Sequence, residues 1–306
     1  MNLGFLTVCL GNMPLREKAE FAAKTRFTAL EVAAWPKRND RDYSSCDIDA
    51  ENLTQQEADE IKKYMAELGL EISSLAYYDN NLHSDPALRA AIGGHLRKVI
   101  DAAAMLGVEL VGTFVGRNSN LGFKENFDEF QQVFGGHVKY AKSKGVKIMI
   151  ENCQMFGWLG DGYPGTISHT PEQFREMFRR VPDDNFGLNF DPSHFVPQYI
   201  DYIKAIDEFK DRIFHFHAKD AEILPENLYS YGVYNRRLNH DDNSGYWRYR
   251  MPSLGQVDWD AVISHLKAAK YDGTISIEHE DRLYEGTAEK VKEGLELGYK
   301  FLSELV

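Results

Sequence analysis

The stretch Phe186-Gly-Leu-Asn-Phe-Asp-Pro-Ser-His194 has the alternating pattern of a β-strand with a polar tip. Side chains of a strand point alternately to opposite faces, so the apolar residues would share one face and Asn189 and Asp191 the other. Pro192 cannot donate to a sheet ladder, so the strand should end at Asp191. A carboxylate would then stand at the C-terminal tip of the strand, with the imidazole of His194 just beyond it.

The rest of the chain repeats this unit, a short apolar run followed by a segment of helical composition. The strand-like runs are residues 3–8, 29–33, 70–75, 109–115, 147–151, 186–191, 212–217 and 274–278. The helix-like segments are residues 15–25, 54–68, 86–106, 127–144, 170–180, 199–209, 259–269 and 287–305. Repeated βα units form parallel sheets, and eight of them close into a barrel. The sequence therefore predicts an α/β protein with a single (β/α)8 TIM barrel domain over residues 1–306.

An open, doubly wound sheet is the main alternative to a barrel. That architecture often carries a glycine-rich GxGxxG turn directly after a strand. The paired glycines at 93–94 and 135–136 fall inside expected helices instead. The barrel is therefore the favoured fold.

Composition and charge exclude several function classes. The chain has 306 residues, of which 43% are hydrophobic, and a net charge of -12 at pH 7. This acidity disfavours nucleic acid and anionic membranes as partners. Three cysteines without CxxC spacing indicate reduced thiols, and the N-terminus lacks the basic region of a signal peptide. We therefore expect a cytoplasmic protein that acts on a small molecule.

Three long segments follow expected strands, at residues 34–53, 153–169 and 218–257. In a barrel they would lie on the C-terminal face, where barrel active sites are built. The third, a long loop after strand seven, holds six aromatic residues: Tyr229, Tyr231, Tyr234, Tyr246, Trp247 and Tyr249. Because long ordered loops are usually functional, we expect this loop to cover a site.

Four consecutive strands end in residues that can bind a metal. Strands five to eight end at Glu151, Asp191, His217 and Glu278. Any one of them alone would more simply be a helix cap or a hydrogen-bonded core residue. On four successive strands, all four side chains would point to the same face and meet at the barrel mouth. Three carboxylates brought together there need a counter-charge. Oxygen-rich ligation with one imidazole suits Mn²⁺, Mg²⁺, Co²⁺ or Zn²⁺.

The sequence around these positions resembles the xylose isomerase-like barrels, also called sugar phosphate isomerases/epimerases, over essentially the whole chain. The motifs are Ile-Glu-Asn (150–152), Asn-Phe-Asp-Pro-Ser-His (189–194), His-Ala-Lys-Asp (217–220), Leu-Gly-Gln-Val-Asp-Trp (254–259) and Ile-Glu-His-Glu-Asp (277–281). In the ketose 3-epimerase branch one divalent metal, commonly Mn²⁺, is bound by the residues matching Glu151, Asp191, His217 and Glu278. The resemblance also implies that the two glutamates exchange substrate protons and that His194 contacts the substrate. From its position alone, His194 could orient a sugar hydroxyl or act as a hydrogen-bond partner of the metal ligands.

This chemistry predicts a metal-dependent isomerase or epimerase of a keto-sugar or inosose. A metal that holds the carbonyl and a neighbouring hydroxyl stabilises the enediolate formed on proton loss. Glu151 and Glu278 could stand on opposite faces of the sugar, one removing a proton and the other returning one. Return to the same carbon gives epimerisation, and return to the neighbouring carbon gives isomerisation.

Several other residues could belong to the site, but each also has a simpler structural explanation. Lys219 follows the metal histidine and is either a substrate contact or a surface charge. Arg248 and Arg250 either bind an acidic or phosphorylated sugar or form cation–π contacts in the aromatic loop. His240 is equally open. Glu31, at the end of strand two, is the weakest candidate for the barrel mouth.

The sequence also departs from the ketose 3-epimerase pattern, so other functions stay open. Residues 153–158 and 219–223 lack the glutamate and arginine typical of that branch, which argues against a simple ketohexose substrate. A lyase or dehydratase acting on a keto-inositol or 3-keto-sugar could use the same metal site. An AP-endonuclease-like DNA repair enzyme would need more histidines, and a non-catalytic sugar-binding barrel would not need the glutamates. A monomer and a homo-oligomer, dimer or tetramer, are both compatible with the sequence.

Overall fold

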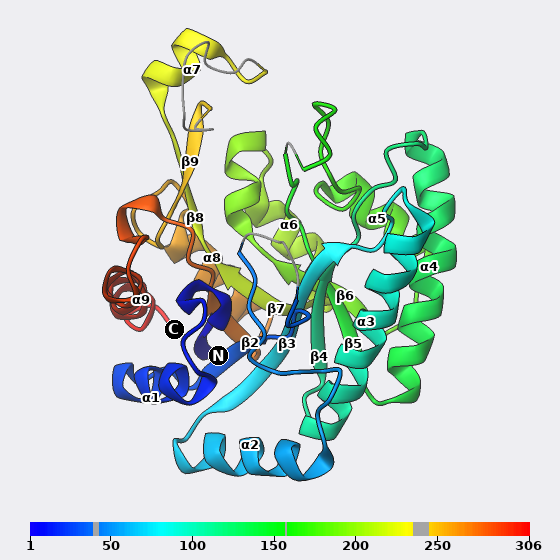
Figure 1. Cartoon of the computed structure of the whole chain (residues 1–306). Helices are drawn as coiled ribbons and strands as arrows, with labels where there is room; N and C mark the ends of the chain where they lie inside the picture. The colour runs from blue at the N-terminus through cyan, green and yellow to red at the C-terminus, as the bar shows by residue number, and fades with distance from the viewer. Residues whose placement is uncertain (39–42, 157, 235–244) are drawn as a thin grey trace.

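Eight parallel strands form a closed barrel, which confirms the predicted fold (Figure 1). The computed structural model describes residues 1–38, 43–156, 158–234 and 245–306. Around the barrel the strand order is β1-β10-β7-β6-β5-β4-β3-β2. The barrel strands are β1 (Asn2–Leu6), β2 (Ala29–Ala33), β3 (Glu71–Asn80), β4 (Leu110–Phe114), β5 (Lys147–Glu151), β6 (Phe186–Phe190), β7 (Ile213–Ala218) and β10 (Thr274–Ile277).

Helices surround the barrel and close most of the βα units. They are α1 (Leu15–Thr25), α2 (Gln55–Glu67), α3 (Pro86–Leu106), α4 (Phe123–Ser143), α5 (Pro171–Arg180), α6 (Tyr202–Phe209), α8 (Trp259–Ala268) and α9 (Ala288–Leu302). Thr54 and Glu57 form a reciprocal capping box at the start of α2. Gly107 ends α3 with φ at +71°, a conformation that glycine adopts without strain. Within the described ranges, no helix has both the length and the apolar composition needed to cross a bilayer.

Two strand boundaries differ from the prediction by more than one residue. The first strand ends at Leu6, and residues 7–10 turn into a short 3₁₀ helix. The third strand runs on to Asn80, beyond the expected end at Leu75. Its last residues read Tyr-Asp-Asn, which resembles a turn, but Asn80 pairs with Phe114 across a register shift in the β3–β4 ladder. Tertiary pairing therefore overrides the local preference.

The polar face of strands β5, β6, β7 and β10 points into the barrel, as the alternation predicts. Asn189 pairs in register with Glu151 on one side and with His215 on the other. His215 then reaches Ser73 of β3 across the barrel, with Nε2 3.1 Å from Oγ. The register thus places the strand-end acids in one ring above an interior polar layer.

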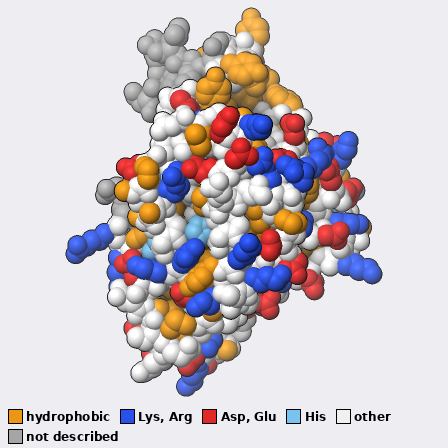
Figure 2. All heavy atoms as spheres, turned by 90° about the vertical axis from the view of Figure 1, so that its right-hand side faces the viewer, with side chains coloured by type: hydrophobic (Ala, Val, Ile, Leu, Met, Phe, Trp, Pro, Cys, Tyr) orange, Lys and Arg blue, Asp and Glu red, His pale blue; other side chains and the backbone are white. Residues whose placement is uncertain are grey.

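The segment after β7 is a folded arm, where the sequence predicted a long loop. Strands β8 (Asp220–Ile223) and β9 (Trp247–Arg250) pair antiparallel, and α7 (Pro225–Tyr231) extends away from the barrel (Figure 1). Hydrophobic side chains gather at the top of the molecule in Figure 2. Tyr229 of α7 is 89% exposed, and Tyr234, beyond the helix, is 97% exposed. Tyr229 and Tyr234 therefore do not cover the barrel mouth, whereas Trp247 and Tyr249 of β9 do. His240 lies outside the described residues.

Candidate metal and substrate site

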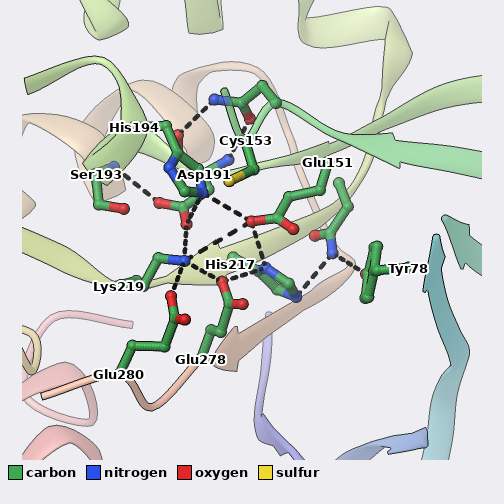
Figure 3. Close-up of polar contacts among 12 residues, drawn as sticks. Tyr78, Glu151, Cys153, Asp191, Ser193, His194, His217, Lys219, Glu278 and Glu280 are labelled. Atoms are coloured by element: carbon green, nitrogen blue, oxygen red, sulfur yellow. Dashed lines mark hydrogen bonds and ion pairs between the residues drawn. The ribbon is translucent and has the colours of Figure 1, made fainter. Parts of the chain in front are cut away.

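The four predicted metal ligands come together at the C-terminal mouth of the barrel. Glu151, Asp191, His217 and Glu278 are buried, and each offers one ligand atom within 4.8 Å of the others (Figure 3). Nδ1 of His217 lies 3.0 Å from Oε2 of Glu278 and 3.5 Å from Oε1 of Glu151. The strand phase read from the sequence thus gives a compact set of three carboxylates and one imidazole.

Asn152, directly after Glu151, fixes the position of Asp191. Its side-chain amide accepts a hydrogen bond from the Asp191 backbone N–H and donates one to the Asp191 carbonyl, both at 2.8 Å. Oδ1 of Asp191 in turn accepts from the backbone N–H of Ser193 at 2.8 Å and caps the short 3₁₀ helix of residues 192–194. One carboxylate oxygen is therefore engaged by the backbone, while Oδ2 faces the other ligands.

Glu31 orients His217, although its sequence position made it the weakest candidate. Oε2 of Glu31 lies 2.8 Å from Nε2 of His217, and Oε1 accepts a 2.6 Å hydrogen bond from Tyr78. Burial opposes ionisation, but the charges of His217 and His215 and these hydrogen bonds lower the pKa of Glu31 to about 2. With its proton on Nε2, toward Glu31, His217 would direct the lone pair of Nδ1 at the three carboxylates, the usual arrangement of a metal-binding histidine.

The donor set fits a divalent cation. Oδ2 of Asp191 and Nδ1 of His217 are buried and, among the described residues, make no hydrogen bond of good geometry. Buried polar atoms of this kind usually have a partner, and two of them aimed at one point fit a missing ligand. Three oxygen donors and one imidazole suit Mn²⁺, Mg²⁺, Co²⁺ or Zn²⁺, and the structure does not choose among them.

Lys219 lies inside the site and is not a surface charge. It is 1% exposed, and its ammonium is 2.6 Å from Glu278, 2.8 Å from Glu280 and 3.3 Å from Asp191. Burial lowers the pKa of a lysine, but these carboxylates outweigh it and hold the pKa of Lys219 well above its usual value. The ammonium offsets part of the negative charge of the donor set.

The two glutamates have different proton affinities. Burial, followed by the charge of Glu151, raises the pKa of Glu278 to about 7, against the opposing influence of Lys219 and His217. Burial also acts on Glu151, but Lys219 and hydrogen bonds from His194 and His217 hold its pKa well below the usual value. Within the protein's own charges, one carboxyl is ionised and the other can carry a proton near neutral pH.

His194 is held between the ligands and the arm. Its Nε2 lies 2.9 Å from Oε1 of Glu151 and 3.3 Å from Oδ2 of Asp191, and its Nδ1 is 3.0 Å from the Tyr249 hydroxyl of β9. The ring is fully buried and is not part of the cavity wall. Direct contact of His194 with a substrate stays a prediction.

A cavity of about 510 Å³ opens beside the donor set. Among the described residues its wall consists of Leu6, Trp35, Tyr43, Tyr78, Phe114, Glu151, Cys153, Gln154, Met155, Phe156, Trp158, Lys219, Trp247, Tyr249, Glu278 and Glu280. All three long segments that follow strands contribute to this wall, which confirms their predicted position at the mouth.

The two arginines of the arm are engaged elsewhere. Arg248 pairs with Glu222 at 2.8 Å, and Arg250 pairs with Glu222 at 2.6 Å and with Asp281 at 2.9 Å. Neither belongs to the cavity wall. Substrate binding by Arg248 therefore stays a prediction that these contacts do not support.

Glu31, His215 and His217 form a second group with the spacing of metal ligands. Both ring nitrogens of His215 already have partners, since Nδ1 is 3.0 Å from Oδ1 of Asn189 and Nε2 is 3.1 Å from Oγ of Ser73. Burial lowers the pKa of His215 to about 4. We therefore assign this group to a hydrogen-bond network beneath the mouth.

Sequence reasoning assigned no individual site role to three residues that shape the site: Asn152, Tyr249 and Glu280. Asn152 follows a strand-end acid, so its position next to the mouth was a readable signal. Tyr249 belongs to the Trp-Arg-Tyr-Arg alternation of residues 247–250, which is typical of a strand. Glu280 reaches Lys219 only because the barrel brings the ends of β7 and β10 together, and no sequence pattern signals that contact.

Comparison with known proteins agrees with this geometry. Residues 19–303 match the family model of the xylose isomerase-like TIM barrel. An inosose isomerase of Bacillus velezensis is 24% identical over 287 residues, which are 92% of this chain and 89% of that protein. Two uncharacterized proteins, from Bacillus subtilis and Methanocaldococcus jannaschii, match over only 44% and 43% of their lengths.

Solved structures share the fold over the whole chain. The IolI protein with a bound zinc atom superposes with a TM-score of 0.72 at 21% identity, covering 100% of this chain and 99% of that one. A D-psicose 3-epimerase crystallised with D-fructose gives a TM-score of 0.71 at 15% identity, covering 100% and 99%. Because the family model spans nearly all of the sequence, this chain belongs to the xylose isomerase-like TIM barrel family.

Proposed function

We propose that this protein is a divalent-metal-dependent sugar isomerase or epimerase that acts on a keto-sugar or inosose. The observation that carries the proposal is the presence of Glu151 and Glu278 in both the donor set and the cavity wall. They come from β5 and from the end of β10, which two other strands separate in the barrel. Two carboxyl groups on different sides of a bound sugar suit removal of a proton from one face and its return to the other.

The chain's own residues divide the work of this reaction. One cation would be held by Glu151, Asp191, His217 and Glu278. We propose Mn²⁺, with Zn²⁺, Mg²⁺ and Co²⁺ as alternatives. A bound cation supplies positive charge that stabilises the enediolate formed when the sugar loses its proton. Glu151 and Glu278, which belong to both the donor set and the cavity wall, would exchange the proton, one removing it and the other returning it.

The names of the relatives support the same reaction class. An inosose isomerase matches most of the chain, and a D-psicose 3-epimerase shares its fold. The zinc in the IolI structure supports a metal-dependent site. The chain departs from simple ketose epimerases in its arm, so the identity of the sugar is a separate question.

The test is a Glu278→Gln variant, which keeps the size of the side chain and removes its ability to carry a proton. Metal content is measured by elemental analysis, and substrate exchange is followed in D₂O by mass spectrometry with a panel of ketoses and inososes. We expect exchange to fall at least about 100-fold. Unchanged exchange in the variant would exclude Glu278 as a proton carrier, and the absence of exchange in the metal-loaded wild type would exclude the reaction class.

A lyase or dehydratase on a keto-inositol or 3-keto-sugar is the second candidate. The buried ammonium of Lys219 favours it, because a cation in the cavity wall 2.6 Å from Glu278 could stabilise the negative charge of a leaving oxygen. Product mass separates the two reactions. An isomerase leaves the mass unchanged, whereas a dehydratase removes one water and a lyase removes the aglycone.

A further inference from the structure

The cavity is larger than a single sugar requires. Its volume is about 510 Å³, whereas one hexose at the packing density of organic crystals takes up roughly 200 Å³. A monosaccharide bound at the donor set would fill less than half of this space. Pockets usually enclose most of their ligand, so the remaining volume indicates a second group on the substrate.

The wall of the cavity changes in character from the barrel outward. The inner part comes from strand residues such as Tyr78 and Phe114, which are buried, together with the catalytic glutamates. The outer part comes from the long segments and the arm, and it includes Tyr43, Phe156 and Trp247. Phe156 is 61% exposed and Tyr43 is 36% exposed, so both present aromatic surface to the mouth. Aromatic surface of this kind binds the flat faces of sugar rings and aryl groups.

The charges of the wall disfavour an acidic or phosphorylated substrate. Among the described residues that line the cavity, Lys219 is the one cationic side chain and none is an arginine. Lys219 already contacts Glu278, Glu280 and Asp191. In the outer part of the cavity, a phosphate would therefore find, among the described wall residues, no cationic side chain free of a carboxylate partner.

The side-chain amide of Gln154 is a neutral polar group available to a substrate. Gln154 is 2% exposed, lines the cavity, and its Oε1 has no hydrogen-bond partner among the described residues. A buried amide oxygen left without a donor is costly, and a sugar hydroxyl supplies the missing donor. An aromatic wall with an unpaired amide suits an uncharged polyol.

We propose that the natural substrate is an uncharged keto-sugar that carries a second ring, as a glycoside or disaccharide does. The inference rests on the proposed function and names its substrate class. The sugar that reacts lies against Glu151 and Glu278 in the inner part. The second ring lies in the outer part, against the aromatic side chains of Phe156 and Trp247.

Binding of unreactive probes tests the substrate class without requiring turnover. Calorimetric titration of the Mn²⁺-loaded protein compares D-glucose, D-glucose 6-phosphate and phenyl β-D-glucoside. We expect the phenyl glucoside to bind tighter than glucose, on the order of tenfold, and the phosphate to bind no better than glucose. Equal affinity for glucose and its phenyl glucoside, or tightest binding of the phosphate, would overturn the inference.

Variants locate the second ring. Phe156→Ala and Trp247→Ala should each reduce the preference for phenyl glucoside over glucose, whereas Tyr229→Ala, on the exposed face of α7, should keep it. A preference that survives both substitutions would refute binding in the outer part. Phe156 is mostly exposed, so its variant gives a result even if Trp247→Ala does not fold.

Proton exchange in D₂O then tests the proposed reaction and the proposed substrate class separately. The 3-keto forms of glucose and of phenyl glucoside are compared in the same assay. Exchange that is faster in kcat/KM for the glycoside supports both the reaction and the substrate class. Exchange that favours the free sugar overturns only the substrate class. Absence of exchange with either compound counts against the proposed reaction, while the binding order still decides the substrate class.

Discussion

Replacement of Glu31 by glutamine should weaken metal binding without removing a metal ligand. Glu31 accepts from Tyr78 at 2.6 Å and lies 2.8 Å from Nε2 of His217. Glutamine has nearly the same shape but no charge, so it supports the imidazole less strongly. Loss of such a partner typically costs 10–100-fold in metal affinity, which is about 1.4–2.7 kcal/mol.

The same substitution should change the acid sensitivity of the fold. The pKa of Glu31 is about 2, against an ordinary value of 4.5. A lowered pKa means that the ionised form stabilises the native state by about 3 kcal/mol. This contribution is complete above pH 4.5 and disappears as the pH falls toward 2. Glu31→Gln should therefore unfold with a shallower pH dependence between these values.

Competition with a fluorescent chelator measures the affinity for Mn²⁺ and Zn²⁺, and denaturant melts from pH 2 to 7 measure stability. Glu60→Gln is the matched control, because it makes the same chemical change on the exposed side of α2. Glu31→Asp, which keeps the charge, should recover part of the affinity. Metal affinity of Glu31→Gln within twofold of the control would refute the role of Glu31.

Three further substitutions test how residues of the barrel and its helices contribute to stability and to metal binding. Burial, with the charge of Arg97, lowers the pKa of His137 to about 4. The free energy of unfolding should therefore fall by about 3 kcal/mol as the pH falls from 6.5 to 4. Denaturant melts of His137→Gln should not show this fall. Gly116→Ala should cost about 3 kcal/mol or more by thermal unfolding, because φ is +81° and the new Cβ would lie 1.8 Å from Oδ1 of Asn80. Asn152→Ala leaves two backbone groups of Asp191 unpaired, so we expect a loss of about 2–3 kcal/mol and weaker Mn²⁺ binding; titration with unchanged affinity would contradict this.

The parts of the fold set by local patterns were predictable from sequence. The strand Lys147–Glu151 and the helix Pro86–Leu106 have the expected bounds, because alternation and a terminal glycine mark them. The arm was not predicted, because its strands β8 and β9 are short and separated by more than twenty residues. Their pairing depends on the partner strand more than on their own composition.

The candidate site divides in the same way. The alternation within each strand shows that its terminal residue points into the barrel, so the four residues of the donor set were predictable. The hydrogen bonds that orient the donor set were not predictable, because Glu31 and His217 are 186 residues apart and meet only in the closed barrel. Lys219 could not be distinguished from a surface lysine until Glu280 and Glu278 were seen on either side of it.

The position of Lys219 explains how three buried carboxylates can be held ready for a cation. Like charges at this distance would raise each other's pKa values and push the side chains apart. The ammonium contacts Glu278 and Asp191 of the donor set, and Glu280, outside the set, anchors it from the other side. It therefore reduces repulsion within the donor set, in which the pKa of Glu278 is raised to about 7. In the proposed reaction, this one set of side chains would supply both the metal-binding charge and the proton carrier.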